Sequence, residues 1–544
     1  MKNIAEVLFK SKKYWIIYLV FILITCMSAL SANNSSISNF LITTFFIVAV
    51  VGVLCIVYYF MYDSENELYK VAFVIILCFG IMSSMIVPIC DVSDELEHLT
   101  RAEITSQGVI FPHWEGGKNN LTQLYNHTDT GRYSNKLNTD VGFYTSQSHM
   151  FFLHNLGKTV YDTPDDTEKI SDKQILDGSA FEQNPFYGYL PQAIGIFIAK
   201  LLDLSVMWML WLGRIFNLLC YAGLISLAVR KAPVFKIQLL AVACIPISLY
   251  QAASISIDSM IIGLGILAIA YFLYLYKAKA ESLDTKHIAI FCGLCLLLGL
   301  CKLPYLAFVF LILFVPKSNF KNKNAIWFML LGILIVGGIG VLWSTYSEPA
   351  LMHSWRSKLN TMDAGLQAAY LMDHPNFVLR FIKVLFTTTL GIVFNGFFNF
   401  FSAASPNHYA DHYTLITTLI WIFLAITLLF YPNRPVFNNK SRIGAFLIII
   451  LIYVGTCFIQ LLTWADVGAY NIGVSTRYFL PLFALIPIVV AFNPNIIERL
   501  IGPDRFGWLK DKYDTFGLYF NRYSMILIIG FMASMILAFA TKYY

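Results

Sequence analysis

Long apolar runs, separated by short polar stretches, dominate this chain of 544 residues. A transmembrane helix needs about 20 apolar residues, and runs near that length recur along the whole chain. We therefore expect an all-α polytopic membrane protein, a bundle of about 13 transmembrane helices. The spans are predicted near residues 14–31, 40–62, 71–90, 206–229, 237–252, 259–276, 287–300, 304–316, 325–345, 413–431, 443–463, 478–492 and 524–540.

Basic residues orient these spans. Lys10, Lys12 and Lys13 precede the first run, and positive charge collects on the cytoplasmic side of membranes, so we expect a cytoplasmic N-terminus. A cleavable signal peptide that ends near Ser31 is the competing interpretation. With the first interpretation, the third run ends on the outside of the plasma membrane, and segment 91–185 becomes an extracytoplasmic loop.

Two longer segments interrupt the alternation of spans. Segment 91–185 is polar and long for a connection, which favours a functional loop. We expect residues 186–202 to form an interfacial helix, because a crossing there would carry the basic cluster after residue 229 to the outside. Segment 346–412 must begin and end on one side. Its apolar stretch 384–401 is therefore re-entrant or interfacial, or one of a pair of short crossings.

The same features divide the chain into parts. The parts are an N-terminal transmembrane hairpin (1–70), a core that carries the loop 91–185 and the interfacial helix 186–202 (71–345), a second external segment (346–412) and the C-terminal transmembrane helices (413–544).

Composition and charge narrow the class of partner. The chain is 58% hydrophobic and only 13% charged, about half the usual globular share, so membrane lipids are its surroundings. The net charge of +6 fits inner loops, and no basic run with interleaved aromatic residues lies outside the membrane, so nucleic acid is not an expected partner. Most of the ten cysteines lie in or beside apolar runs and are typical of packing residues. Cys292 and Cys295 have metal-ligand spacing but no neighbouring histidine, so we do not expect a zinc site there.

The start of the 91–185 loop carries the most informative chemistry. If a helix begins at Ser93, then Asp94, His98 and Arg101 lie at positions i, i+4 and i+7 and share one face. A carboxylate, an imidazole and a fixed cation on one face are typical of acid/base and phosphate chemistry. The alternative is structural: Asp94 and Glu95 are first-turn acids that stabilise the helix N-terminus, and His98 is a buried hydrogen-bonding residue.

Several cations are expected on the outer side, where they are rare by default. A ring of Arg and Lys facing Asp94 and Glu95 suits a lipid-borne phosphate or diphosphate, because Arg binds phosphate oxygens through paired charged hydrogen bonds. Alternatively, some of these side chains reach lipid headgroups. An arginine two turns into an apolar run, Arg214, is by default a functional candidate. The outer cations are Lys302, Arg356, Lys358, Arg380, Lys383 and Arg477.

A resemblance follows from these motifs. Pro88 followed by Asp94-Glu95-x-x-His98-x-x-Arg101-Ala102 and Gly108 resembles the signature of a bacterial multi-pass membrane protein family of unknown function, related to the GT-C glycosyltransferase superfamily. The likeness covers about residues 80–490. Other pieces resemble later landmarks of that family in order: Asn184-Pro-Phe-Tyr-Gly-Tyr-Leu-Pro191, Ser254-Ile-Ser-Ile-Asp258, Cys301-Lys302-Leu-Pro304-Tyr305 and Arg477-Tyr-Phe-Leu-Pro481.

The resemblance implies a GT-C-like bundle with a long first extracytoplasmic catalytic loop. In such a fold an acidic residue of that loop acts on a sugar carried by a polyprenyl phosphate, and the acceptor is a glycan or a lipid-linked saccharide. By position the acid is Asp94, with Glu95 as the alternate. Two apolar runs precede the span that leads to the motif, which departs from the usual GT-C order.

We expect Asp94 to act as general base for an acceptor hydroxyl, which predicts an inverting glycosyltransferase. Arg477, with Arg214 or Lys302, would stabilise the departing lipid phosphate. His98 and Arg101 would orient the acid or bind the same phosphate. Tyr187 and Tyr189 are candidates for the sugar or lipid path. The residues identify no particular cofactor, and a divalent metal at Glu95 stays open as an alternative.

Two other functions compete with an enzyme. One is a transporter or flippase of lipid-linked saccharides, and the other is a non-catalytic envelope-assembly protein. A transporter predicts ionisable residues near the membrane midplane, whereas here they gather at one face. This asymmetry favours an enzyme, provided that the acid and the cations meet in one pocket on the outside.

Overall fold

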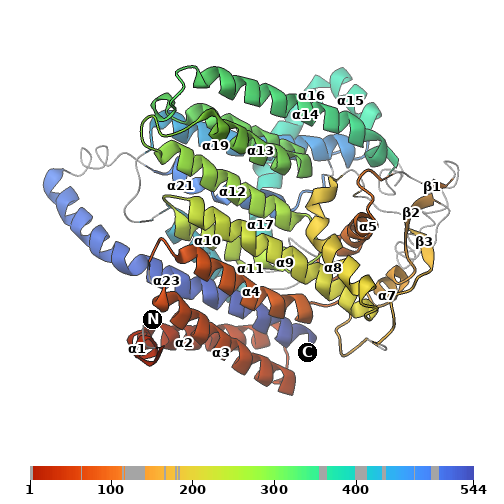
Figure 1. The fold of residues 1–544 in the computed structure, drawn as a ribbon, viewed down its shortest axis with the longest axis horizontal. Helices are drawn as coiled ribbons and strands as arrows, with labels where there is room; N and C mark the ends of the chain where they lie inside the picture. Colours follow the sequence, from red (N-terminus) through yellow and green to blue (C-terminus); the bar gives the residue numbers. More distant parts are fainter. Residues whose placement is uncertain are drawn as a thin grey trace.

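A computed structural model describes residues 4–62, 64–112, 115–116, 141–163, 167–177, 181, 184–353, 364–398, 413–429, 431, 437–470, 472–491 and 502–544. The predictions at Arg356 and Lys358, and part of segment 346–412, lie outside these residues. Helices run roughly side by side through most of the protein, and three short strands lie at one end (Figure 1). The prediction of an all-α polytopic membrane protein is confirmed at this level.

In the described part of the chain, nine helices are long and apolar enough to cross a membrane. They are α2 (Lys12–Asn33), α3 (Asn39–Met61), α4 (Leu68–Ile86), α9 (Val206–Lys231), α12 (Asp258–Lys277), most of α14 (Ala325–His353), the stretch Pro375–Phe394, α19 (Asn439–Thr463) and the end of α23 (Pro503–Tyr543). The stretch Pro375–Phe394 runs through α16 (Pro375–Val384), one π-helical turn, η5 (Leu385–Thr389), and the start of α17 (Leu390–Phe398).

Other apolar elements of the described chain are shorter. α8 (Leu190–Leu201) lies within the segment that we expect to form an interfacial helix. With 12 residues it is too short to cross a membrane alone. Its position at the membrane interface stays a prediction. Shorter apolar helices are α8 (Leu190–Leu201), α13 (Thr285–Cys301), the 3₁₀ helix η3 (Leu303–Phe314) and α18 (Thr414–Leu429). The remaining small helices are α1 (Ile4–Lys10), α15 (Ala364–Asp373), η2 (Phe186–Gly188) and η4 (Lys317–Asn319).

Proline breaks two of the predicted spans. The 237–252 run divides into α10 (Lys236–Cys244) and α11 (Pro246–Ala252), because Pro246 offers no N–H and holds the preceding Ile245 in an extended conformation. The 478–492 run divides into η7 (Thr476–Phe479), α20 (Leu480–Phe483) and α21 (Ile486–Val489), and prolines open the last two.

Packing gives the bundle a centre and a rim. α9 packs against α4, α8 and α12, and both α12 and the final span of α23 are almost enclosed by protein. α14 is mostly exposed and so belongs to the rim. α23 packs against α2, α3 and α4, so the last helix of the chain joins the N-terminal hairpin to the core (Figure 1).

The polar end is built around one buried helix. α5 (Glu95–Ser106) packs against α8 and against a small antiparallel sheet in the order β1–β2–β3. The strands are β1 (Glu115–Gly116), β2 (Val141–Ser146) and β3 (Gln174–Asp177), and α7 (His149–His154) follows β2. The N-terminus lies at the opposite end of the helices from this sheet (Figure 1).

A buried charge network fastens the sheet to α5. His149 lies between Glu103 of α5 and Asp177 of β3, and its Nδ1 is 3.0 Å from the Asp177 carboxylate. Burial opposes charge on His149, yet the two carboxylates outweigh it and raise its pKa to about 9. Burial would raise the pKa of Glu103, but His149 and Lys200, whose Nζ is 2.5 Å away, lower it to about 2. The polar end is thus held by a charged histidine.

We predict that this network gives the polar end a defined pH window. The Glu103 contribution is complete above its unfolded pKa of 4.5 and is lost as the pH falls through about 2. The His149 contribution is complete below its unfolded pKa of 6.5 and is lost as the pH rises through about 9. Amide exchange of β2, taken relative to its intrinsic rate at each pH, should therefore be slowest between these unfolded values and accelerate as the pH passes 9.

The control for this prediction is His149→Gln, which keeps a polar side chain but removes the charge. It should lower the stability of the polar end by roughly 3 kcal/mol and abolish the alkaline acceleration. Equal protection of β2 in the two proteins at all pH values would contradict the role of the network.

Candidate functional site

A turn of the backbone at Asp94 directs its carboxylate away from α5. Asp94 has a left-handed conformation, φ 64°, and α5 begins only at Glu95. Asp is one of the few residues that adopt this region at modest cost. The predicted common face of Asp94, His98 and Arg101 is therefore wrong for Asp94, since this residue precedes the helix. Its side chain makes no capping bond to α5 either.

Asp94 instead meets a cation from the far end of the chain. Arg477 Nη2 lies 2.6 Å from Asp94 Oδ2, and Arg477 Nη1 donates to the carbonyl of Ser93 at 3.3 Å. Nε of the same guanidinium is 2.9 Å from a carboxylate oxygen of Asp258, the first residue of α12. Arg477 thus bridges two acids. Of the three side chains Asp94 is the most exposed, at 18%, against 7% for Asp258 and 4% for Arg477.

A second cation stands beside this cluster. Lys302, between α13 and η3, places Nζ 3.0 Å from the ring centroid of Tyr478. The Tyr305 hydroxyl donates to the Tyr478 carbonyl at 2.7 Å and so ties η3 to η7. Loss of water around Lys302, with the positive charge of Arg477, lowers the pKa of Lys302 to about 7 against the opposing effect of Asp258. Two acidic and two basic side chains from four separate parts of the chain therefore lie close together.

Sequence reasoning did not assign a role to Asp258. The available signal was the run Ser254-Ile-Ser-Ile-Asp258, a polar stretch ahead of an apolar helix. Asn217 Nδ2 donates to the carbonyl of Ser254 at 2.7 Å, and Gln192 Nε2 donates to that of Ser256 at 3.1 Å. These bonds from α9 and α8 fix the segment that presents Asp258 to Arg477.

Glu95 and Arg214 form a separate, fully buried pair. Arg214 donates from Nε and Nη2 to the two oxygens of Glu95 at 2.8 and 2.7 Å, and the backbone N–H of Ile255 donates to Glu95 at 2.8 Å. The other N–H groups of Arg214 donate to three backbone carbonyls at the end of α4, those of Ser84, Val87 and Pro88. All five donors of this guanidinium are used. The geometry favours a structural role over catalysis, phosphate binding or metal ligation at these two residues.

His98 also points into protein. Its Nδ1 is 2.6 Å from the hydroxyl of Tyr189, and its ring stacks on Phe181 with centroids 4.3 Å apart. Asn184 Nδ2 donates to the same hydroxyl at 2.9 Å. Burial raises the pKa of Tyr189 and keeps its hydroxyl protonated. These contacts favour the structural alternative for His98.

Arg101 and the two tyrosines predicted for the sugar or lipid path also make their hydrogen bonds within the protein. Arg101 donates to the side chain of Thr105 at 2.7 Å and to the carbonyls of Asn184 and Ile110 at 3.2 Å. Tyr189 is fully buried, so it lines no open path in this conformation. Tyr187 is half-buried at the rim, where its hydroxyl donates to the Leu297 carbonyl at 2.6 Å.

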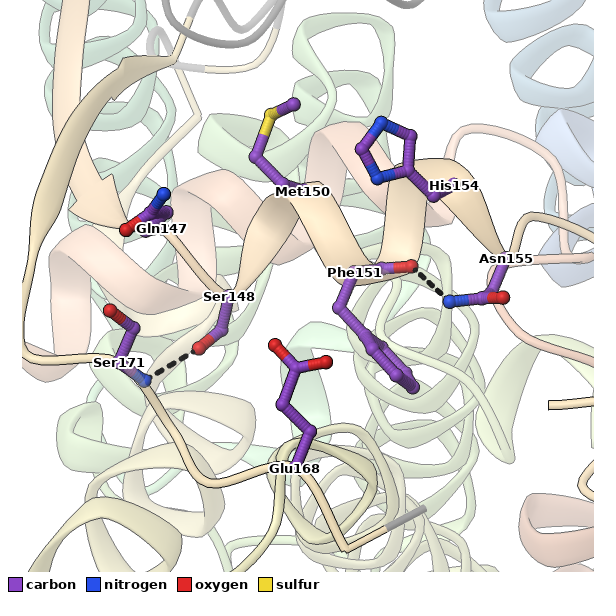
Figure 2. A pocket seen from close by; sticks show the side chains of 8 residues that line it. All are labelled: Gln147, Ser148, Met150, Phe151, His154, Asn155, Glu168 and Ser171. Atoms are coloured by element: carbon purple, nitrogen blue, oxygen red, sulfur yellow. Dashed lines mark hydrogen bonds between the residues drawn. The ribbon is translucent and has the colours of Figure 1, made fainter. Parts of the chain in front are cut away.

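Metal ligands do not converge here. Among the described residues, no three or more His, Cys, Asp or Glu side chains gather as a metal site. A polar cavity of about 350 Å³ lies elsewhere, between α7 and the segment that precedes β3 (Figure 2). There, Ser148 Oγ accepts from the N–H of Ser171 at 2.8 Å, and Glu168 projects toward α7 from below (Figure 2).

The family is settled by comparison with known sequences. The profile of a family described as a predicted membrane protein (DUF2142) matches residues 77–486, well over half of the chain. The chain belongs to this family. No curated protein and no solved structure matches it. The matched range contains Asp94, Asp258, Lys302 and Arg477, so the whole cluster lies within the DUF2142 region.

We predict that Arg214 of this DUF2142 protein is needed for folding. Lysine has three hydrogen-bond donors where arginine has five, and it lacks the planar guanidinium. Arg214→Lys therefore leaves some oxygens of Glu95 and of the end of α4 without a donor. We expect the free energy of unfolding to fall by at least about 2 kcal/mol. Thermal unfolding of the purified protein in detergent measures this. Arg230→Lys, exposed at the end of the same helix, is the matched control and should unfold like the wild type. Unchanged unfolding of the Arg214 variant would restore the ligand-binding interpretation.

Proposed function

We propose that this protein is an inverting membrane glycosyltransferase of the GT-C type. It would transfer a sugar from a polyprenyl-phosphate donor to a cell-envelope glycan or lipid-linked acceptor on the extracytoplasmic face of the plasma membrane. The observation that carries the proposal is the convergence of Asp94, Arg477 and Lys302 at one end of the bundle. An acid beside two cations, where apolar helices end, suits a reaction that removes a proton and releases a lipid-borne phosphate.

The geometry divides the roles among the residues. Asp94 is the most exposed carboxylate of the cluster and takes the proton of the acceptor hydroxyl. The hydroxyl oxygen attacks the anomeric carbon, and the bond from that carbon to the phosphate oxygen breaks with its electron pair on the phosphate. Lys302 lies beside Arg477 and binds the departing phosphate. Asp258 acts through Arg477 and is a positioning residue.

The distribution of charge separates this proposal from a transporter. Arg214 is two turns into α9, but its partners are the carbonyls at the end of α4 and Glu95 at the start of α5. The pair therefore belongs to the same end of the bundle as Asp94. A transporter of lipid-linked saccharides would place ionisable groups near the midplane, where both sides of the membrane have access to them.

The first test replaces the proposed base. Asp94→Asn keeps the size of the side chain and removes its basicity, so we expect transfer to fall by roughly 10²–10⁴-fold. Envelope glycans of a deletion strain that carries the variant would report the loss, with protein levels measured by immunoblot. Asp172→Asn, an exposed acid of the same polar segment, is the matched control. Full restoration of the glycan by Asp94→Asn at normal protein level would refute the base assignment.

The second test concerns the charge of Lys302. Its pKa of about 7 means that the cation is present below pH 7 and is lost as the pH rises through 7. Transfer should therefore decline above pH 7 in the wild type. Lys302→Arg stays charged throughout and should keep its rate in that range. The measurement is the pH profile of initial transfer rates with membranes of each protein at donor concentrations well below saturation, where the pKa of the free protein governs the rate. Parallel profiles would exclude Lys302 as the phosphate-binding cation.

A further inference from the structure

An apolar groove opens on the rim of the bundle next to the cation site. Its volume is about 530 Å³, and it lies between η3, α14 and α19. Large side chains of all three elements that line it are exposed, namely Phe310, Leu334 and Leu451. No charged residue lines it. The groove is therefore open to the lipid side of the bundle and offers only apolar contacts.

The 3₁₀ helix shapes one wall. With three residues per turn, side chains three apart lie in line, so Pro304, Ala307 and Phe310 form one row and Leu306 and Val309 form another. The rise of about 2 Å per residue stretches the 12 residues of η3 to roughly 24 Å, most of the thickness of the hydrocarbon layer. The narrow 3₁₀ helix thus leaves the groove open beside α14.

Glycines keep the opposite wall open. Gly337 and Gly338 of α14 line the groove, and a Cβ added to either would meet no atom within 4 Å. Gly455 of α19 lies across from Pro304, and a Cβ there would meet only the ring of that proline at 3.7 Å. Elsewhere on α14, Gly340 is closely packed against Leu306. The two open glycines are therefore not explained by helix packing.

We propose that this groove holds the isoprenoid chain of the polyprenyl-phosphate donor, a proposal that rests on the function above. Pro304, which lines the groove, is two residues from Lys302, whose amine adjoins Tyr478 and Arg477. A ligand that places an anion at Lys302 and continues as an apolar chain fits both halves at once. A bilayer phospholipid is the competing occupant, and the experiment below includes phosphatidic acid to distinguish it.

The experiment uses the full-length protein in nanodiscs of phosphatidylethanolamine and phosphatidylglycerol. Two probes are compared: a long-chain polyprenyl phosphate, which reaches the groove, and dimethylallyl phosphate, which carries the same phosphate with one isoprene unit. A Cβ at Gly338 would meet no atom within 4 Å, so Gly338→Leu places its side chain in the groove. Gly293→Leu is the matched control, because Gly293 also faces open space but on α13, outside the groove.

We expect Gly338→Leu to weaken binding of the long-chain probe roughly tenfold or more, since each displaced methylene loses its contact with the wall. Binding of dimethylallyl phosphate and the behaviour of Gly293→Leu should not change. Equal long-chain affinity in wild type and Gly338→Leu would overturn the groove and leave the proposed function standing. Equal competition by phosphatidic acid would show a general lipid site and would also overturn it. If neither phosphate binds the wild type, the donor chemistry of the proposed function fails as well.

Discussion

A guanidinium removed from water needs carboxylates, and two arginines at the polar end of this protein satisfy that need with neighbouring acids. Arg477 forms an ion pair with Asp94, and Arg214 forms one with Glu95, the next residue along the chain. The left-handed conformation of Asp94, just ahead of α5, separates the directions of these two adjacent carboxylates. Such pairs lose much of their Coulomb energy to desolvation, so we interpret them as fixing positions more than as adding stability.

The segment before α12 connects the two pairs. The N–H of Ile255 donates to Glu95, and three residues later Asp258 contacts Arg477. A shift of this segment would therefore disturb the structural pair and the candidate site together. Its backbone is held by buried amide side chains from α8 and α9, whose N–H groups donate to the carbonyls of Ser256 and Ser254.

The sequence predicted what depends on composition and missed what depends on backbone geometry. α2, α3 and α9 were predicted because each is one uninterrupted apolar run. Hydropathy does not depend on which backbone groups bond to each other. The 3₁₀ form of η3 and the π turn within 384–401 could therefore not be predicted from it. The 384–401 stretch proved to begin earlier, in a helix that starts at Pro375.

For the candidate site, charge logic brought Asp94 and Arg477 together, since an outer cation opposes the usual bias and needs a reason. It could not decide which of the adjacent acids, Asp94 or Glu95, faces Arg477, because that depends on the φ angle of Asp94. It also assumed a regular helix from Ser93, which placed His98 and Arg101 beside Asp94. Their actual partners, Tyr189 and Asn184, lie about 90 residues away in the chain and come close only through the packing of α5 on η2 and α8.

The balance of charge in the cluster explains why a lysine accompanies the arginine. Asp94 and Asp258 together carry one negative charge more than Arg477 offsets, so without a second cation the cluster would repel an incoming phosphate. Lys302 is poised near pH 7, and a bound phosphate would raise its pKa, because an anion favours the charged amine. Phosphate binding and proton uptake at Lys302 are then linked, and each strengthens the other. Release of the phosphate lowers the pKa of the amine to about 7 again, so near neutral pH part of the protein gives up this proton.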